Sequence, residues 1–320
     1  MIFVMRQILN RLNAQIKKYT MKLKLLIACT TLLTIAVQKT QAQINPDGFF
    51  NKKGEANISL SYTYATYEKF FLGLDQVDAV PAHNQIDQNI YNIYANYGIT
   101  DKITAIINLP YIKATGDGAA DPVNGTTEQS DLQDISLLVK WAPFTTQHEN
   151  GTTTGVIAIG GSYALNYEPN GILSIGNGAS SIDAKLGLQY NNNSGFFGNA
   201  FVGYSIRGEA DNNLGLGTGA KYDVPNSLNA QIKIGYAGKS FYADAWFDAQ
   251  KSNGILDINS ANFAGNFPET KVGYSRVGLN LYAPITKTLG VSLASGTVVS
   301  GRNIGKGTYY SGGITIGLGK

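Results

Sequence analysis

The chain has 320 residues, of which 43% are hydrophobic and only 15% are charged, and it contains 37 Gly, 19 Tyr and one Cys. A typical soluble domain carries about 25% charged residues, so this composition argues against a disordered chain and fits a cytosolic enzyme poorly. Seven of the 25 basic residues and no acidic residue fall within residues 1–42, which leaves 18 basic against 22 acidic residues, a net charge of −4, in the remainder. The remainder therefore lacks the basic surface of a nucleic-acid-binding protein.

Residues 21–42 have the layout of a secretory signal peptide. Lys22 and Lys24 form a short positive region, and residues 25–37 form a mostly apolar stretch that is too short to span a bilayer as a helix. Thr-Gln-Ala at residues 40–42 provides a small-residue cleavage site. The pattern predicts export across the inner membrane.

This signal sets the expected boundaries of the mature protein. Translation is expected to begin at Met21, with residues 1–20 as an extension or a mis-assigned start, although the sequence leaves Met1 open as the true start. Cleavage before Gln43 predicts a single domain over residues 43–320. That domain contains no cysteine, so it would fold without a disulfide.

Beyond residue 43, apolar and polar residues alternate with a period of two, and no segment shows a helical stripe. Residues 57–64 show the pattern clearly, with Ile58, Leu60 and Tyr62 on one face and Ser59, Ser61 and Thr63 on the other. The same alternation recurs in residues 103–111, 135–141, 182–190 and 228–236. Counting such segments predicts about 12 strands, centred near residues 60, 92, 107, 137, 160, 186, 202, 232, 246, 278, 293 and 314.

The predicted connections alternate between short and long. The short ones lie at residues 100–102, 191–195, 237–240 and 284–288, with a longer member of this set at 142–152, and the long ones lie near 68–86, 113–131, 168–180, 208–226, 251–270 and 300–307. In a transmembrane barrel the short turns are periplasmic, both termini lie at that end, and the strand count is even. The pattern predicts an all-β fold, a transmembrane antiparallel up-and-down β-barrel.

Aromatic residues on the apolar face gather near the predicted strand ends. They are Tyr97, Trp141, Tyr190, Tyr236 and Phe241 at the short-turn end, and Tyr64, Tyr111, Tyr163, Tyr204 and Tyr310 toward the long-loop end. Two aromatic rings around a band of aliphatic residues are typical of membrane barrels. The alternative is a large soluble β-sandwich with cross-strand tyrosines.

The hairpin around residues 237–240 allows a register to be predicted. If Tyr236 lies opposite Phe241, then Lys233 lies opposite Asp244. Polar residues then meet polar residues and apolar residues meet apolar ones, as a two-faced sheet requires.

Three segments resemble the MetA-pathway phenol-degradation family of outer-membrane barrels. YGITDKI at residues 97–103, followed by LPY at 109–111, is similar to a hairpin of that family, and DLQDISLLVKW at 131–141 is similar to one of its strands. Residues 301–305 resemble its late loop. The resemblance implies a passive outer-membrane transporter or channel for small, often hydrophobic compounds.

Catalytic and metal-binding patterns are scarce in the sequence. The two histidines, His83 in a predicted long loop and His148 in a predicted periplasmic turn, are not expected to line the barrel. No Ser–His or Asp–His constellation can be assembled, and no Cys cluster or His pair has metal-ligand spacing. We therefore predict no enzymatic activity, no metal site and no cofactor.

The predicted inward face carries the candidate pore residues, which are Lys140, Lys185, Lys233, Asp244, Trp246, Asp248 and Arg276. One interpretation is that the charged ones form cross-strand pairs that fill a narrow interior, Lys233–Asp244 being the best candidate. The other is that they create a field at a constriction and select solutes by charge. Inward Trp246, together with Phe197 and Phe201, could line a path for apolar solutes or simply fill space.

These observations predict an outer-membrane protein of a Gram-negative bacterium, a monomer that contacts membrane lipid and binds no nucleic acid. The expected function is passive transport of small, hydrophobic or aromatic compounds through a narrow lumen, because 12 strands lie between filled 8-strand barrels and open 16-strand porins. The alternative is a structural or surface-interaction barrel whose long loops bind partners without transport.

Overall fold

The computed structural model describes residues 46–319, which form 17 β-strands and one short 3₁₀ helix, η1 (Phe267–Glu269). The predicted boundaries at residues 1–20 and 21–42 lie outside the described residues. Among residues 46–319 there is no helix of the length and apolarity that crossing a membrane requires.

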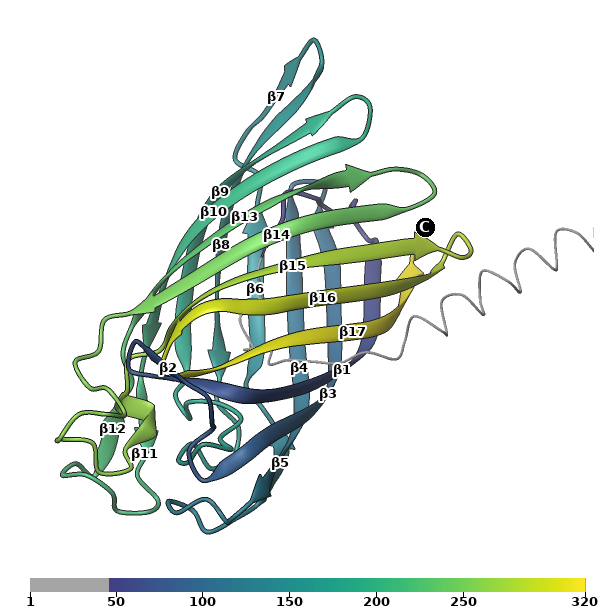
Figure 1. The fold of residues 1–320 in the computed structure, drawn as a ribbon. Helices are drawn as coiled ribbons and strands as arrows, with labels where there is room; N and C mark the ends of the chain where they lie inside the picture. The colour runs from purple at the N-terminus through teal and green to yellow at the C-terminus, as the bar shows by residue number, and fades with distance from the viewer. Residues whose placement is uncertain (1–45, 320) are drawn as a thin grey trace, which may run out of the picture. The chain divides into compact units, whose positions relative to one another are not determined.

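Twelve antiparallel strands close into a barrel, which confirms the predicted architecture (Figure 1). Pairing of the last strand with the first closes the sheet, from Ala56 opposite Leu318 to Phe71 opposite Ile304. The barrel strands are β1 (Ala56–Leu72), β3 (His83–Thr100), β4 (Ile103–Gly118), β6 (Ile135–Trp141), β8 (Gly151–Tyr163), β9 (Ser181–Asn192), β10 (Phe196–Arg207), β13 (Ser227–Ala237), β14 (Tyr242–Ser252), β15 (Gly273–Pro284), β16 (Leu289–Arg302) and β17 (Ile304–Leu318).

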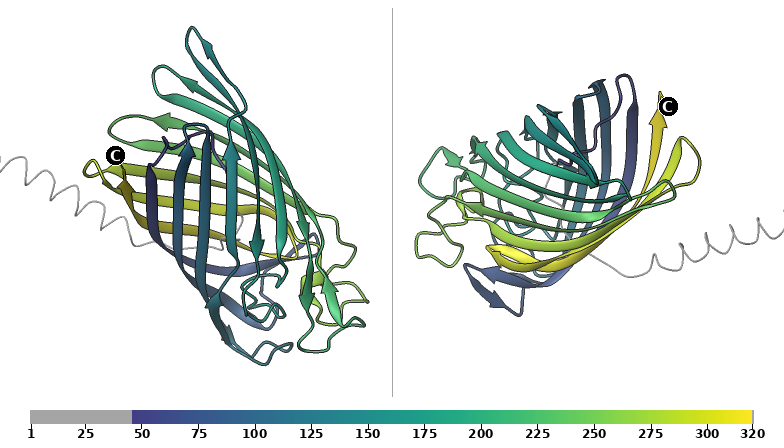
Figure 2. Two further views of the ribbon diagram at one scale, coloured as in Figure 1. Left: turned by 180° about the vertical axis from the view of Figure 1, so that it is seen from behind. Right: turned by 90° about the horizontal axis from the view of Figure 1, so that it is seen from above.

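Five short strands extend this frame. They are β2 (Asp75–Val77) on β1, β5 (Glu128–Leu132) on β4, β7 (Thr145–His148) on β8, and the separate pair β11 (Glu209–Asp211) and β12 (Lys221–Asp223). Except between β16 and β17, the connections alternate in length as predicted, with tight turns at one end of the barrel and extended loops at the other (Figure 2). These ends are called the short-turn end and the long-loop end below.

The prediction of a long connection over residues 300–307 is wrong, because Asn303 alone separates β16 from β17. The two strands stop pairing with each other after Thr297 and Thr308, yet β16 continues along β15 and β17 continues along β1. Each strand thus keeps its backbone hydrogen bonds through its other neighbour. Asn303 makes the turn at a φ of 50°, a left-handed conformation that asparagine tolerates better than most residues.

The two faces of the wall have opposite character, as the alternation predicts. Outward aliphatic side chains are exposed over the whole wall, for example Ile93 (50%), Leu186 (57%) and Leu279 (59%). Inward positions are small, polar or charged and are mostly buried, Gln189 and Ser205 at 0% exposure among them. The apolar residues of the strands face outward rather than toward a central core, which is the arrangement of a barrel surrounded by lipid.

Strand β5 and strand β6 are one barrel strand interrupted by a bulge. Tyr111 of β4 pairs with Leu132, whereas Asn108 pairs with Ser136, so one extra residue lies on the β5–β6 side. The gap lies opposite Pro110, which has no backbone N–H to donate; its carbonyl still accepts from the backbone of Gln133 at 2.9 Å. The bulge leaves Asp134 buried against the lumen.

Candidate functional site

The structure places all seven predicted pore residues on the inner face of the barrel. Lys140, Lys185, Asp244 and Asp248 are at most 5% exposed, and Lys233, Trp246 and Arg276 are partly buried. They do not form one ring, because they come from strands on different sides of the barrel and lie at different heights. Two groups result: a charged ladder on β13 to β15, and two separate lysines on β6 and β9.

The ladder on β13 to β15 consists of two ion pairs. Asp248 accepts hydrogen bonds from Nε (3.0 Å) and Nη2 (2.5 Å) of Arg276, the residue directly opposite it on β15. The guanidinium of Arg276 also stacks over the ring of Tyr274. Lys233 Nζ lies 3.6 Å from Asp244 Oδ2. The predicted Lys233–Asp244 pair is therefore present, and both pairs bridge neighbouring strands inside the barrel.

The register predicted for this hairpin is wrong by two residues. Tyr236 lies opposite Ala243 rather than Phe241, and Lys233 lies opposite Trp246. The reason is the turn: Gly238 donates its backbone N–H to the carbonyl of Phe241 at 2.9 Å, which leaves two residues rather than four at the tip. A shift of two preserves both faces, and a lysine reaches its diagonal neighbour, so the ion pair survives the change.

Lys140 holds a segment of chain inside the lumen. Residues 46–52 precede β1 and run within the barrel, where Lys140 Nζ donates to Asp47 Oδ1 at 2.6 Å, to Asp47 O at 3.3 Å and to Phe49 O. The backbone N–H of Gly48 donates to Gln189 Oε1 at 2.7 Å, from β9, which is separated from β6 by β8. We call residues 46–52 the lumen segment.

The lumen segment is also packed tightly against the wall. Phe49 contacts Phe197 edge to face, with ring centroids 5.1 Å apart, and Phe197 in turn stacks on Tyr242. A Cβ at Gly48 would lie 2.4 Å from Gln189 Cβ, and one at Gly98 would lie 2.1 Å from Lys52 O. Only glycine permits these approaches, so the segment is seated closely in the short-turn half of the barrel.

A cavity of about 200 Å³ occupies the long-loop half of the lumen. Apolar side chains of the wall line it, including Phe70, Ile112 and Val298. Three cationic residues, Lys185, Arg207 and Arg276, and two acidic residues, Asp134 and Asp183, also line it.

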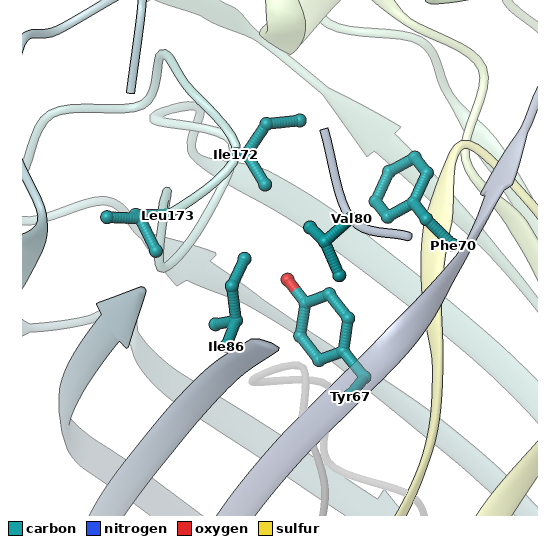
Figure 3. Packing of buried hydrophobic residues seen from close by; sticks show 6 residues of the cluster. All are labelled: Tyr67, Phe70, Val80, Ile86, Ile172 and Leu173. Carbon is teal, nitrogen blue, oxygen red and sulfur yellow. The ribbon is translucent and has the colours of Figure 1, made fainter. Parts of the chain in front are cut away.

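The connection between β8 and β9, residues 164–180, folds into the barrel and covers this cavity. Its Ile172 and Leu173 pack against side chains of β1 and β3, among them Phe70 and Ile86, in one buried cluster (Figure 3). We call residues 164–180 the inner loop.

Two carboxylates tether the inner loop. The hydroxyl of Tyr167 donates to Asp134 at 2.5 Å, and the backbone N–H of Ile172 donates to Asp121 Oδ2, also at 2.5 Å. Asp121 is fully buried and accepts from Val123 as well. The loop is therefore fixed by polar contacts at two points, Asp134 in the wall and Asp121 in the connection between β4 and β5, as well as by apolar packing.

Several residues of this arrangement were not predicted. The contacts that seat the lumen segment and the inner loop and that line the cavity involve Asp47, Gln189, Arg207 and Tyr167. For only one of these, Gln189, does the sequence pattern show that the side chain points inward. The other three lie in or beside connections, where alternation carries no information on direction. The only signal for the lumen segment is a stretch of Pro, Asp and Gly before the first strand.

The histidines do not form catalytic pairs within the described chain. His148 Nε2 lies 2.9 Å from the Thr153 hydroxyl in the exposed β7–β8 hairpin. His83 begins β3 rather than lying within a loop, and it is buried with neither ring nitrogen hydrogen bonded. Among residues 46–319 no group of three or more His, Cys, Asp or Glu side chains is placed to hold a metal ion.

Comparison with known proteins identifies a solved structure of similar fold. No protein-family model and no curated protein matches the chain, so the resemblance to the MetA-pathway family stays a prediction. Among solved structures, the COG4313 outer membrane channel from Pseudomonas putida F1 superposes with a TM-score of 0.69 at 11% identity, over 86% of this chain and 100% of that one. The NanC porin (TM-score 0.45, 10% identity, 82% and 100% covered) and a Pseudomonas aeruginosa FadL homologue (0.34, 9%, 82% and 90%) are more distant. The described chain thus shares the fold of the COG4313 channel, a closed 12-strand transmembrane barrel.

Proposed function

We propose that this protein is an outer-membrane channel for the passive transport of small, hydrophobic or aromatic compounds. The observation that carries the proposal is the cavity inside the barrel, because a space lined largely by apolar side chains and enclosed by a membrane-spanning wall suits an apolar solute. The similarity in fold to a channel protein supports it.

The proposed orientation follows from the loops and the predicted signal peptide. The short-turn end faces the periplasm and the long-loop end faces the exterior, as in bacterial barrels of this kind. Lipid then surrounds the exposed aliphatic band, and the protein acts as a monomer because one chain closes the sheet by itself.

The proposed path runs from the cavity toward the short-turn end. A solute leaving the cavity in that direction meets the charged ladder of β13 to β15 and then the lumen segment. Because the lumen segment is held by Lys140 and Gln189, transport requires it to leave its seat. The lumen segment is therefore the gate of the proposed channel, and the wild-type channel is expected to open only in brief events.

The test is reconstitution of the full chain in planar bilayers with a lipopolysaccharide leaflet. Brief openings, and their block by an aromatic solute such as benzyl alcohol, support transport through the lumen. A preparation that shows no openings and no uptake of the solute into vesicles contradicts the proposal, provided that the barrel is shown to be folded by its gel mobility before and after heating.

A surface-interaction barrel is the second candidate, and exposed apolar residues in the long connections favour it. Ile255 is 93% exposed and Leu74 is 69% exposed, both at the long-loop end. Substituting both with serine tests this candidate: loss of a cell-surface binding phenotype with unchanged permeability supports it, whereas unchanged binding contradicts it.

A further inference from the structure

Inside the cavity, one cationic side chain has no acidic partner at ion-pair distance. Arg207 ends β10, and its guanidinium donates to two uncharged acceptors, Pro225 O at 3.1 Å and Gln250 Oε1 at 3.2 Å. Among residues 46–319 no carboxylate forms an ion pair with it. A guanidinium has five N–H groups in a planar fork, so donors remain for a ligand.

Three of the other charged groups of the cavity, Arg276, Asp134 and Asp183, are already engaged. Arg276 is neutralised by its two contacts with Asp248, and Asp134 accepts from the Tyr167 hydroxyl. Asp183 accepts from the hydroxyl of Ser181 at 3.1 Å. These acids repel a second negative charge, which restricts an anionic ligand to one charge, placed at the guanidinium.

The rest of the cavity is suited to a small apolar body. Ile172 and Ile175 of the inner loop face Phe70, Ile112 and Leu138 of the wall around the same space. An apolar cavity of about 150 Å³ is large enough for benzene. The volume of about 200 Å³ therefore leaves room for one ring and one small substituent.

We propose that this cavity binds a small organic monocarboxylate, with its apolar ring beneath the inner loop and its carboxylate on the guanidinium of Arg207. The assignment rests on the proposed function, since it names the solute class of the same lumen. A bidentate carboxylate satisfies the fork of Arg207 and supplies the ion pair that no described side chain provides.

The experiment compares benzoate with benzamide, which has nearly the same shape and no charge, by calorimetric titration of the full chain in detergent. Benzoate is expected to bind about tenfold more tightly, because a hydrogen bond to a charged group is worth more than a neutral one. Arg207→Gln is expected to remove this preference while leaving benzamide binding unchanged. Lys251→Gln, an exposed lysine at the same end of the barrel, serves as the matched control and should keep the preference.

Arg207→Lys distinguishes loss of the ligand contact from a folding defect caused by the substitution. This variant keeps the charge without the fork, so it should retain part of the preference for benzoate. Equal affinities of the wild-type protein for the two ligands, or an undiminished preference in Arg207→Gln, would overturn the assignment.

Flux measurements separate this inference from the proposed function. Selective benzoate binding without any passage through the reconstituted protein leaves the site standing and overturns transport. Passage of benzyl alcohol with no preference for benzoate in binding leaves transport standing and overturns the carboxylate site.

Discussion

Replacing Lys140 with methionine is expected to release the lumen segment and raise the open probability of the barrel. Methionine keeps most of the side-chain volume but removes the ammonium, which donates to Asp47 and to two backbone carbonyls of the segment. The ammonium also lies 4.9 Å from the centroid of the Phe50 ring.

The magnitude follows from the loss of these contacts. Hydrogen bonds to a charged group contribute about 1.5–3 kcal/mol each, but the freed carbonyls and Asp47 regain water once the segment leaves the lumen. A net loss of about 3 kcal/mol changes the ratio of seated to unseated segment on the order of a hundredfold. The contacts that Gly48 and Phe49 make with the wall remain in this variant. The lumen segment is therefore expected to leave its seat more often, but not to be released permanently.

The assay is single-channel recording in planar bilayers. Lys140→Met should show more frequent openings than the wild type, and Lys239→Met, an exposed lysine in the turn between β13 and β14, should not. A second readout uses the close approach of Gly48 to Gln189, whose β-carbons would lie 2.4 Å apart. A Gly48→Cys, Gln189→Cys disulfide, which needs the two to separate to about 3.8 Å, should hold the segment in place even in the Lys140→Met background.

The reasoning is refuted if Lys140→Met opens no more often than Lys239→Met. It is refuted equally if the disulfide forms and openings continue unchanged, because the current would then bypass the lumen segment.

Three further predictions concern the wall and the loops. Lys233→Ala should lower the free energy of unfolding by about 1–2 kcal/mol in urea titrations and shift ion selectivity toward cations. The loss of stability is modest because Asp244 keeps two other hydrogen-bond donors. Unchanged unfolding and selectivity would count against the pair. Leu186→Arg, on the exposed outer face, should cost about 2–4 kcal/mol when the barrel is unfolded from lipid vesicles, and no cost would place that face in water. The Arg302 guanidinium holds the pKa of Asp257 at about 2, below its usual 3.8, so their contact contributes stability above pH 3.8 that is lost as the pH falls through 2. Asp257→Asn should remove this dependence at a cost under about 1 kcal/mol, because the pair is only partly buried; an unchanged acid profile in unfolding would contradict it.

The strand pattern predicted most of the wall because a membrane barrel imposes one rule on every strand. Each backbone group must be paired and each alternate side chain must face lipid, so Ile58, Leu186 and Ile232 can be assigned to the outside from sequence alone. The same alternation identified inward Lys233 and Asp244 as a pair, although their register was predicted two residues away.

Register and loop geometry required the tertiary structure. The position of the tight turn after Gly238 depends on one backbone hydrogen bond, and the length of β16 and β17 depends on neighbours that are distant in sequence. Neither is encoded in a period of two, because any even shift satisfies the pattern equally well.

The class of fold, the number of strands and the side of the wall on which most strand residues lie follow from the amino-acid sequence, because lipid selects for apolar side chains at every second position of a strand. What fills the barrel does not follow from it. The lumen segment with Asp47, the inner loop with Tyr167 and the position of Arg207 depend on contacts between residues far apart in the chain, and no local pattern of polarity specifies them.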